Sequence, residues 1–201
     1  MSHQPTYDYS GRTSGDPSLQ YWTKGSVGPK VILVMGFGMR GDIWSRQIQG
    51  LCEDHQLVWF DHRGVGESES GPKALWSMRD MAADSLAVLD ATNWPKAHLV
   101  GVSMGGMIAQ EMVLSQPERF ESLSLIATHP GGSLGAKVPP FPGLRVFTAA
   151  NLRRGEKRLE AIRKLLYPDD YFASTDQEAL RERVRLQLGR PTSGKTLRAQ
   201  L

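Results

Sequence analysis

Cysteine is almost absent from this sequence of 201 residues, because Cys52 is the only one, which excludes an internal disulfide and a cysteine-based metal site. Long hydrophobic runs are absent as well, since no apolar stretch approaches the ~20 residues that a membrane-spanning helix needs. The polar start of the chain, MSHQPTYDYSGRTSGDPS, lacks the apolar centre of a secretory signal peptide. These absences lead us to expect a cytoplasmic protein with no membrane partner.

The composition is that of one globular domain with a sizeable core. Hydrophobic residues make up 40% and charged residues 22%, which argues against a disordered chain. The net charge of +3 is uneven, because residues 145–201 carry 13 Lys and Arg against 7 Asp and Glu. Such a basic segment can bind nucleic acid. Here the basic residues alternate with Glu and Leu at helical spacing, which favours exposed helix faces, so we expect no nucleic-acid partner.

Short apolar runs alternate with amphipathic segments over the first two thirds of the chain. Strands are predicted at 31–35, 57–60, 98–102 and 123–127. Helices are predicted at 43–52, at 77–91 and from the residues after 103 to about 114. This alternation predicts an α/β fold with a mostly parallel sheet. Residues 133–144, SLGAKVPPFPGL, break the rhythm as a linker, and only helical segments follow.

The sequence from Gly101 to Gly105, GVSMG, fits the pattern G-x-S-x-G and lies between a predicted strand and a predicted helix. That context is typical of a nucleophile elbow, in which a strained turn projects the hydroxyl of Ser103 above the sheet. The two glycines leave room where strand and helix converge. The helix begins at the turn, so the backbone N–H of Met104 would face the oxygen of a bound ester.

An acyl-transfer site needs a second N–H donor for the oxyanion, and the turn after an earlier strand supplies it in this arrangement. Here that turn is Met35-Gly36-Phe37-Gly38, in which the N–H of Phe37 is the candidate donor.

Through these two turns and the segments around them, the chain resembles the α/β-hydrolase superfamily, and within it the small esterases, lactonases and methylesterase-like proteins. The similar segments, from about Tyr21 onward, are VILVMGFG, VWFDHRGVGES, HLVGVSMGGMIAQ and PERFESLSLIATHPGG. Met35 stands where many relatives carry His, but the donor is a backbone group, so the oxyanion hole is kept.

The resemblance implies a three-layer α/β-hydrolase sheet with a helical cap. It divides the chain into a polar leader at 1–20, the first part of the hydrolase core at 21–132, and a linker with a helical cap at 133–201. It also implies hydrolysis of a small-molecule carboxylic ester or lactone by Ser103, without a metal or an organic cofactor. The substrate and the oligomeric state stay open.

The acid and the histidine that this family places after later strands have no counterpart in the sequence, although a serine is a poor nucleophile without a base. Asp61 and His62 are assigned to hydrogen bonding within their loop. His129 ends the strand after the elbow and is a candidate base. The remaining histidines are His3, His55 and His98. We therefore expect a fragment whose triad acid and base lie outside the chain; the alternative is a non-catalytic, truncated relative.

Residues 189–196, GRPTSGKT, fit the phosphate-binding pattern G-x-x-x-x-G-K-[ST]. A working phosphate loop leaves a buried parallel strand and enters a helix, so that backbone N–H groups face the phosphates. The preceding residues 181–188, RERVRLQL, are half charged, which is wrong for a central strand. We expect a polar loop between two cap helices, and nucleotide binding through Lys195 is the remote alternative.

Overall fold

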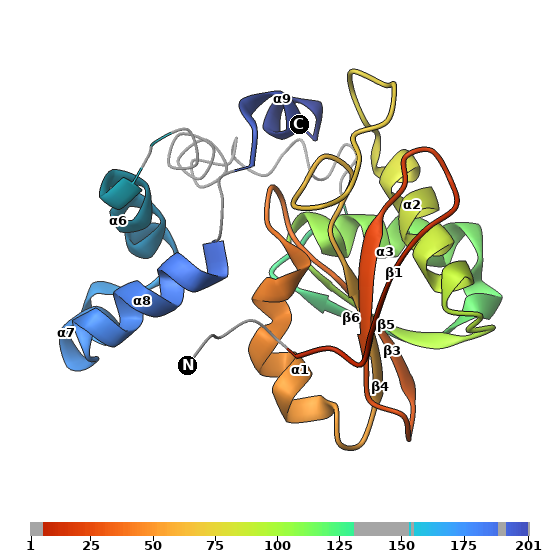
Figure 1. Ribbon diagram of the computed structural model, residues 1–201, viewed down its shortest axis with the longest axis horizontal. Helices are drawn as coiled ribbons and strands as arrows, with labels where there is room; N and C mark the ends of the chain where they lie inside the picture. The colour runs from red at the N-terminus through yellow and green to blue at the C-terminus, as the bar shows by residue number, and fades with distance from the viewer. Residues whose placement is uncertain (1–5, 131–152, 154, 189–191, 201) are drawn as a thin grey trace.

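The computed structural model describes residues 6–130, 153, 155–188 and 192–200 (Figure 1). Six described strands form one sheet in the order β1-β2-β4-β3-β5-β6. They are β1 (Tyr9–Arg12), β2 (Gln20–Lys24), β3 (Lys30–Val34), β4 (Gln56–Phe60), β5 (Ala97–Val102) and β6 (Phe120–Ile126). Strands β4, β3, β5 and β6 run parallel to one another, whereas β2 pairs in the antiparallel sense with both β1 and β4. The four predicted strands and the mostly parallel sheet are therefore confirmed.

Helices cover both faces of the sheet, as the burial of consecutive residues along β3 requires. Ile32 and Val34 pack in one core cluster with residues of α2 and α3, whereas Val31 and Leu33 pack in another with Trp44 and α1. The helices of this part are α1 (Ser45–Leu51), α2 (Met78–Ala91) and α3 (Met104–Ser115), with the 3-10 turns Gly41–Trp44 and Pro117–Arg119. Helix, sheet and helix make the three layers that the resemblance implies.

Further helices lie where the helical cap is predicted. They are α6 (Gly155–Leu166), α7 (Asp169–Ser174), α8 (Gln177–Leu188) and α9 (Gly194–Ala199). In Figure 1, α6, α7 and α8 group together to one side of the sheet, and α9 lies apart from them, nearer α2. Ile162 and Leu180 form a small core between α6 and α8, against which Met39 packs. The predicted linker at 133–144 lies outside the described residues.

The N-terminal part differs from the sequence expectation. Residues 1–20 are predicted to be a polar leader, but Tyr9–Arg12 form the edge strand β1, which pairs with β2. The side chains of β1 are mostly exposed, so the strand carries no apolar alternation that a sequence pattern could detect. At the other edge, β6 begins three residues before the predicted strand, at Phe120.

None of the described helices is both long enough and apolar enough to cross a membrane.

Candidate active site

Ser103 stands alone between the last residue of β5 and the first of α3, in a conformation that few residues with a side chain adopt. Its φ is 55° and its ψ is −122°, and strain of this kind costs about 1–3 kcal/mol. The turn is held in place because Ser103 N–H donates to Ile126 C=O at 2.9 Å and Ser103 C=O accepts from Thr128 Oγ1 at 2.7 Å. The side chain of Ser103 is exposed, as a nucleophile requires.

The two glycines of G-x-S-x-G are sites of close backbone approach. A Cβ on Gly105 would lie 2.2 Å from Val34 C=O, and a Cβ on Gly101 would lie 2.4 Å from Gly105 C=O. Any larger residue would push β5, α3 and β3 apart. The elbow therefore depends on both glycines for the reason that the sequence suggested.

The turn after β3 lies directly against the elbow. A Cβ on Gly36 would be 3.3 Å from Ser103 Cβ and 3.8 Å from Ser103 Oγ. Phe37 and Met104, whose N–H groups are the predicted oxyanion donors, are both buried in one core cluster. The two turns that the sequence singled out are thus brought together at the carboxyl ends of β3 and β5. This is where the strand order reverses, the usual place for a ligand in such sheets.

Asp61 anchors the loop after β4, as predicted. The side chain is fully buried; its Oδ1 accepts from Gly41 N–H at 2.8 Å and its Oδ2 accepts from Glu67 N–H at 3.1 Å. Burial raises the pKa of this carboxyl above its usual value, although the two backbone donors oppose the shift. Asp61 therefore holds the backbone of its neighbours and does not reach for a substrate.

His62 joins the turns after β3 and β4. Its Nε2 lies 2.7 Å from Met35 C=O, and because a carbonyl only accepts, Nε2 carries the proton and donates. Burial lowers the pKa of His62 to about 4, so the ring is neutral at physiological pH. The hydrogen bond of His62 is predicted within its own loop, but its acceptor lies in the turn after β3, at the residue before Gly36.

A buried ion pair beneath the same loop has no signal in the sequence. Arg63 donates from Nε to Asp84 Oδ2 at 2.5 Å and from a terminal nitrogen to Oδ1 at 2.7 Å, and its guanidinium lies 5.7 Å from the ring centre of Trp76. Such two-pronged geometry is the strong form of an arginine–carboxylate pair. The pair ties the loop after β4 to α2, and only the folded arrangement brings its partners together.

Among the described residues, no histidine hydrogen-bonds Ser103 Oγ. His98 Nδ1 lies 2.8 Å from Ser122 Oγ, and His62 is engaged with Met35. His129 follows β6, the strand paired with β5, and its C=O accepts from Gln110 Nε2 at 3.1 Å. Among the described residues, the candidate nucleophile Ser103 thus has no hydrogen bond to a histidine.

The structure differs from a phosphate loop at GRPTSGKT. Helix α8, and no strand, ends at Leu188 before this segment. Ser193 caps α9 by accepting from Thr196 N–H at 3.1 Å, and Thr196 Oγ1 donates to Gly64 C=O at 3.0 Å. Lys195 is exposed. The polar side chains of Ser193 and Thr196 thus bind backbone groups of the chain itself, which supports the predicted loop between helices.

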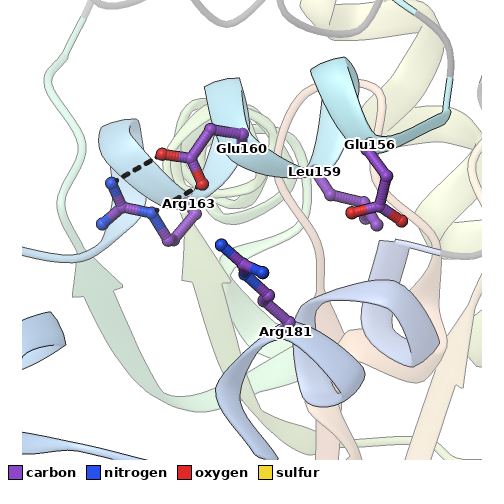
Figure 2. A pocket seen from close by; sticks show the side chains of 5 residues that line it. All are labelled: Glu156, Leu159, Glu160, Arg163 and Arg181. Carbon is purple, nitrogen blue, oxygen red and sulfur yellow. Dashed lines mark hydrogen bonds and ion pairs between the residues drawn. The ribbon is translucent and has the colours of Figure 1, made fainter. Parts of the chain in front are cut away.

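A hollow of about 300 Å³ lies between α6 and α8 (Figure 2). Figure 2 shows Arg163 paired with Glu160 on α6, while Arg181 reaches from α8 toward them. Leu159 and Glu156 complete the lining. The lining is thus two acidic side chains, two basic ones and a leucine, with no nucleophile among them. Within the described residues, no three His, Cys, Asp or Glu side chains gather as metal ligands would.

Comparison with known proteins gives a consistent result. The sequence profile of the family described as "alpha/beta hydrolase fold" matches residues 29–193. RutD of Azorhizobium caulinodans, a protein to which carbamate hydrolase activity is ascribed, is 38% identical over 114 residues, which cover 56% of this chain and 42% of that protein. This chain spans about half, or less, of the length of such curated relatives.

Two solved structures show the same fold at low sequence identity. An enol-lactonase from Burkholderia xenovorans superimposes with a TM-score of 0.72 at 20% identity, covering 95% of this chain and 72% of that one. A thermophilic esterase from Thermogutta terrifontis gives a TM-score of 0.71 at 24% identity, covering 95% of this chain and 71% of that one. Similarity at this level concerns the fold alone.

Proposed function

The chain belongs to the α/β-hydrolase fold family, and we propose that it is a serine hydrolase in which Ser103 attacks the carbonyl of a small carboxylic ester or lactone. The observation that carries the proposal is the strained, exposed Ser103 lying against the turn at Gly36. A backbone conformation this costly supports a role in the reaction better than a role in packing. The enol-lactonase and the esterase among the structural neighbours act on bonds of this class.

In the proposed reaction, Ser103 Oγ forms a bond to the carbonyl carbon and gives its proton to a base. The N–H groups of Phe37 and Met104 hydrogen-bond the oxyanion, and each such donor is worth about 10²–10³ in rate. The carbonyl re-forms as the alcohol leaves with the proton. Water then attacks the acyl-serine, the same base takes the proton of that water, and the acid product is released with Ser103 restored.

The base is proposed to be a histidine, oriented by an acid, outside this chain. Two observations support this: among the described residues no hydrogen bond joins a histidine to Ser103 Oγ, and the curated relatives are about twice as long as the segment they share with this chain. His129 is the candidate within the chain, because it follows β6 beside the elbow.

The single cysteine, Cys52, is unpaired, which supports the cytoplasmic location that we propose.

Labelling by a fluorophosphonate probe tests the proposal, because the probe reacts with an activated serine. In the full natural chain we expect one adduct, on Ser103, which is lost in Ser103→Ala. Ser124→Ala, on the exposed strand β6, is the matched control and should label as the wild type does. A wild type that takes up no probe would instead support the second candidate, a non-catalytic relative that keeps the fold without a working base.

A further inference from the structure

Gly38, in the turn that carries the second oxyanion donor, is held on both sides by the C-terminal segment Thr192–Gln200. Gly38 N–H donates to Gln200 Oε1 at 2.9 Å, and Gly38 C=O accepts from Thr192 Oγ1 at 2.7 Å. Gln200 is only 3% exposed, so water does not compete for its oxygen. A segment more than 150 positions away in sequence therefore fixes the peptide groups on either side of Gly38.

The orientation of the Gln200 amide follows from its partner. Because Gly38 N–H can only donate, the oxygen of Gln200 faces Gly38 and the amino group faces away. That amino group is buried and finds no acceptor among the described residues. Burying an unpaired donor costs about 1–3 kcal/mol. A methionine would occupy the same volume without that cost, so packing alone does not explain a glutamine at position 200. The oxygen that Gln200 offers to Gly38 N–H does explain it.

Helix α9 does not need Gln200 to stay in place. Leu197 and Ala199 are buried in the core cluster that contains Phe37 and Met104. Trp76 N–H donates to Ala199 C=O at 2.8 Å, in addition to the bond from Thr196 to the loop after β4. Removing the Gln200 amide would thus release Gly38 while the helix keeps its other contacts.

The turn is closed by a long backbone hydrogen bond, from Met39 N–H to Gly36 C=O at 3.4 Å, and Gly38 has a φ of 64°. Turn types interconvert when the central peptide rotates, and a glycine in the third position accepts either state. The central peptide here joins Phe37 to Gly38. Its rotation would disturb the neighbouring N–H of Phe37, one of the two proposed oxyanion donors.

We infer that Gln200 is a positioning residue, which locks the Phe37–Gly38 peptide so that the N–H of Phe37 stays directed at the oxyanion. The inference rests on the proposed function. It also gives the segment Thr192–Gln200 a role, because hydrogen bonds from both of its ends hold the turn at Gly38. A displacement of about 1 Å at a reacting centre can cost up to ~10²-fold in rate, so this lock acts on kcat more than on KM.

The test compares Gln200→Met with Lys195→Ala in the full natural chain, using p-nitrophenyl acetate as the probe ester. For Gln200→Met we expect kcat to fall by about ten- to a hundredfold with KM nearly constant. Hydrogen exchange at the Gly38 amide should speed up at least ~10-fold, because its acceptor is lost. Lys195→Ala, on the exposed side of α9, should change neither quantity, whereas a phosphate loop would depend on Lys195.

A faster Gly38 exchange with unchanged kcat would overturn the inference and leave Gln200 a purely structural residue. If hydrogen exchange at the Gly38 amide is as slow in Gln200→Met as in the wild type, the inference is overturned as well. Should Gln200→Met fail to fold, Gln200→Asn replaces it, because its shorter side chain withdraws the acceptor from Gly38 N–H, and the same fall in kcat at constant KM is required. A wild type without esterase activity or probe labelling would refute the proposed function, which is a different result from an active wild type that tolerates Gln200→Met.

Discussion

Gly36 and Ser103, 67 positions apart in the sequence, lie so close that a Cβ on Gly36 would be 3.3 Å from the Cβ of Ser103. Each residue sits at the carboxyl end of a parallel strand, and β3 and β5 are neighbours in the sheet. This contact brings together the turn after β3 and the turn at Ser103, which are the proposed oxyanion turn and nucleophile elbow. It also leaves no spare room between them.

Gly36→Ala should therefore slow the proposed reaction of Ser103. The added methyl group would be closer to Ser103 than most carbon contacts allow, so the turn must move away by a few tenths of an ångström. We expect the rate of probe labelling to fall by about tenfold, because the proposed oxyanion donor Phe37 moves with the turn. Gly50→Ala is the control: a Cβ there meets nothing within 4 Å, and labelling should be unchanged. Equal labelling rates in both variants would contradict the account.

Ser103→Gly should stabilise the protein relative to Ser103→Ala while both variants lose labelling. Glycine adopts the positive φ of this turn freely, whereas alanine keeps the strain of the serine. We expect the free energy of unfolding of the glycine variant to be higher by about 1 kcal/mol, since part of the gain is offset by the greater freedom of glycine in the unfolded chain. Chemical denaturation measures this difference. A glycine variant no more stable than the alanine variant would mean that the elbow is unstrained.

His62 should make folding depend on pH. Its pKa is lowered to about 4 in the folded protein, so the unfolded chain takes up a proton first as the pH falls below about 6.5. The stability that the neutral ring contributes is complete above pH 6.5 and is lost as the pH falls through about 4. Over that interval the loss amounts to about 3 kcal/mol.

His62→Gln removes this titration while it keeps an N–H donor for Met35 C=O. The unfolding free energy of the variant should therefore fall less steeply than that of the wild type between pH 6.5 and pH 4. Parallel pH profiles for the two proteins would show that His62 is protonated in the folded state, contrary to its burial.

The edge strand β6 should promote association of the 201-residue chain. Leu123, Leu125 and Ile126 are between 36% and 45% exposed, on a strand that pairs with β5 on one side. Exposed apolar edges of this kind recruit further strands. Leu125→Lys should reduce light scattering and sedimenting material without lowering the melting temperature. If the wild-type chain is monodisperse at high concentration, this expectation is wrong.

The sequence predicts the elements whose signals are local. The buried strands appear in the sequence as apolar runs, and G-x-S-x-G between a strand and a helix predicts Ser103 as the candidate nucleophile. Both patterns depend on neighbouring residues alone. Strand β1 escapes prediction because its side chains face solvent, and its identity comes from pairing with β2. A local pattern can also mislead, as GRPTSGKT does when its strand and helix context is ignored.

Contacts between distant segments could not be predicted from spacing. The pairing of Arg63 with Asp84 joins a loop to a helix, and the bond from Gly38 to Gln200 crosses almost the whole chain. Neither contact is marked by a periodic pattern or a motif in the sequence. Both become visible only when the sheet order sets which loops lie side by side.

Intact-mass spectrometry of the protein from its native source, before and after fluorophosphonate treatment, tests the central claim most directly. We expect a single adduct, on the peptide that contains Ser103. A protein that remains unmodified, or one modified at another serine, would contradict the assignment of Ser103 as an activated nucleophile.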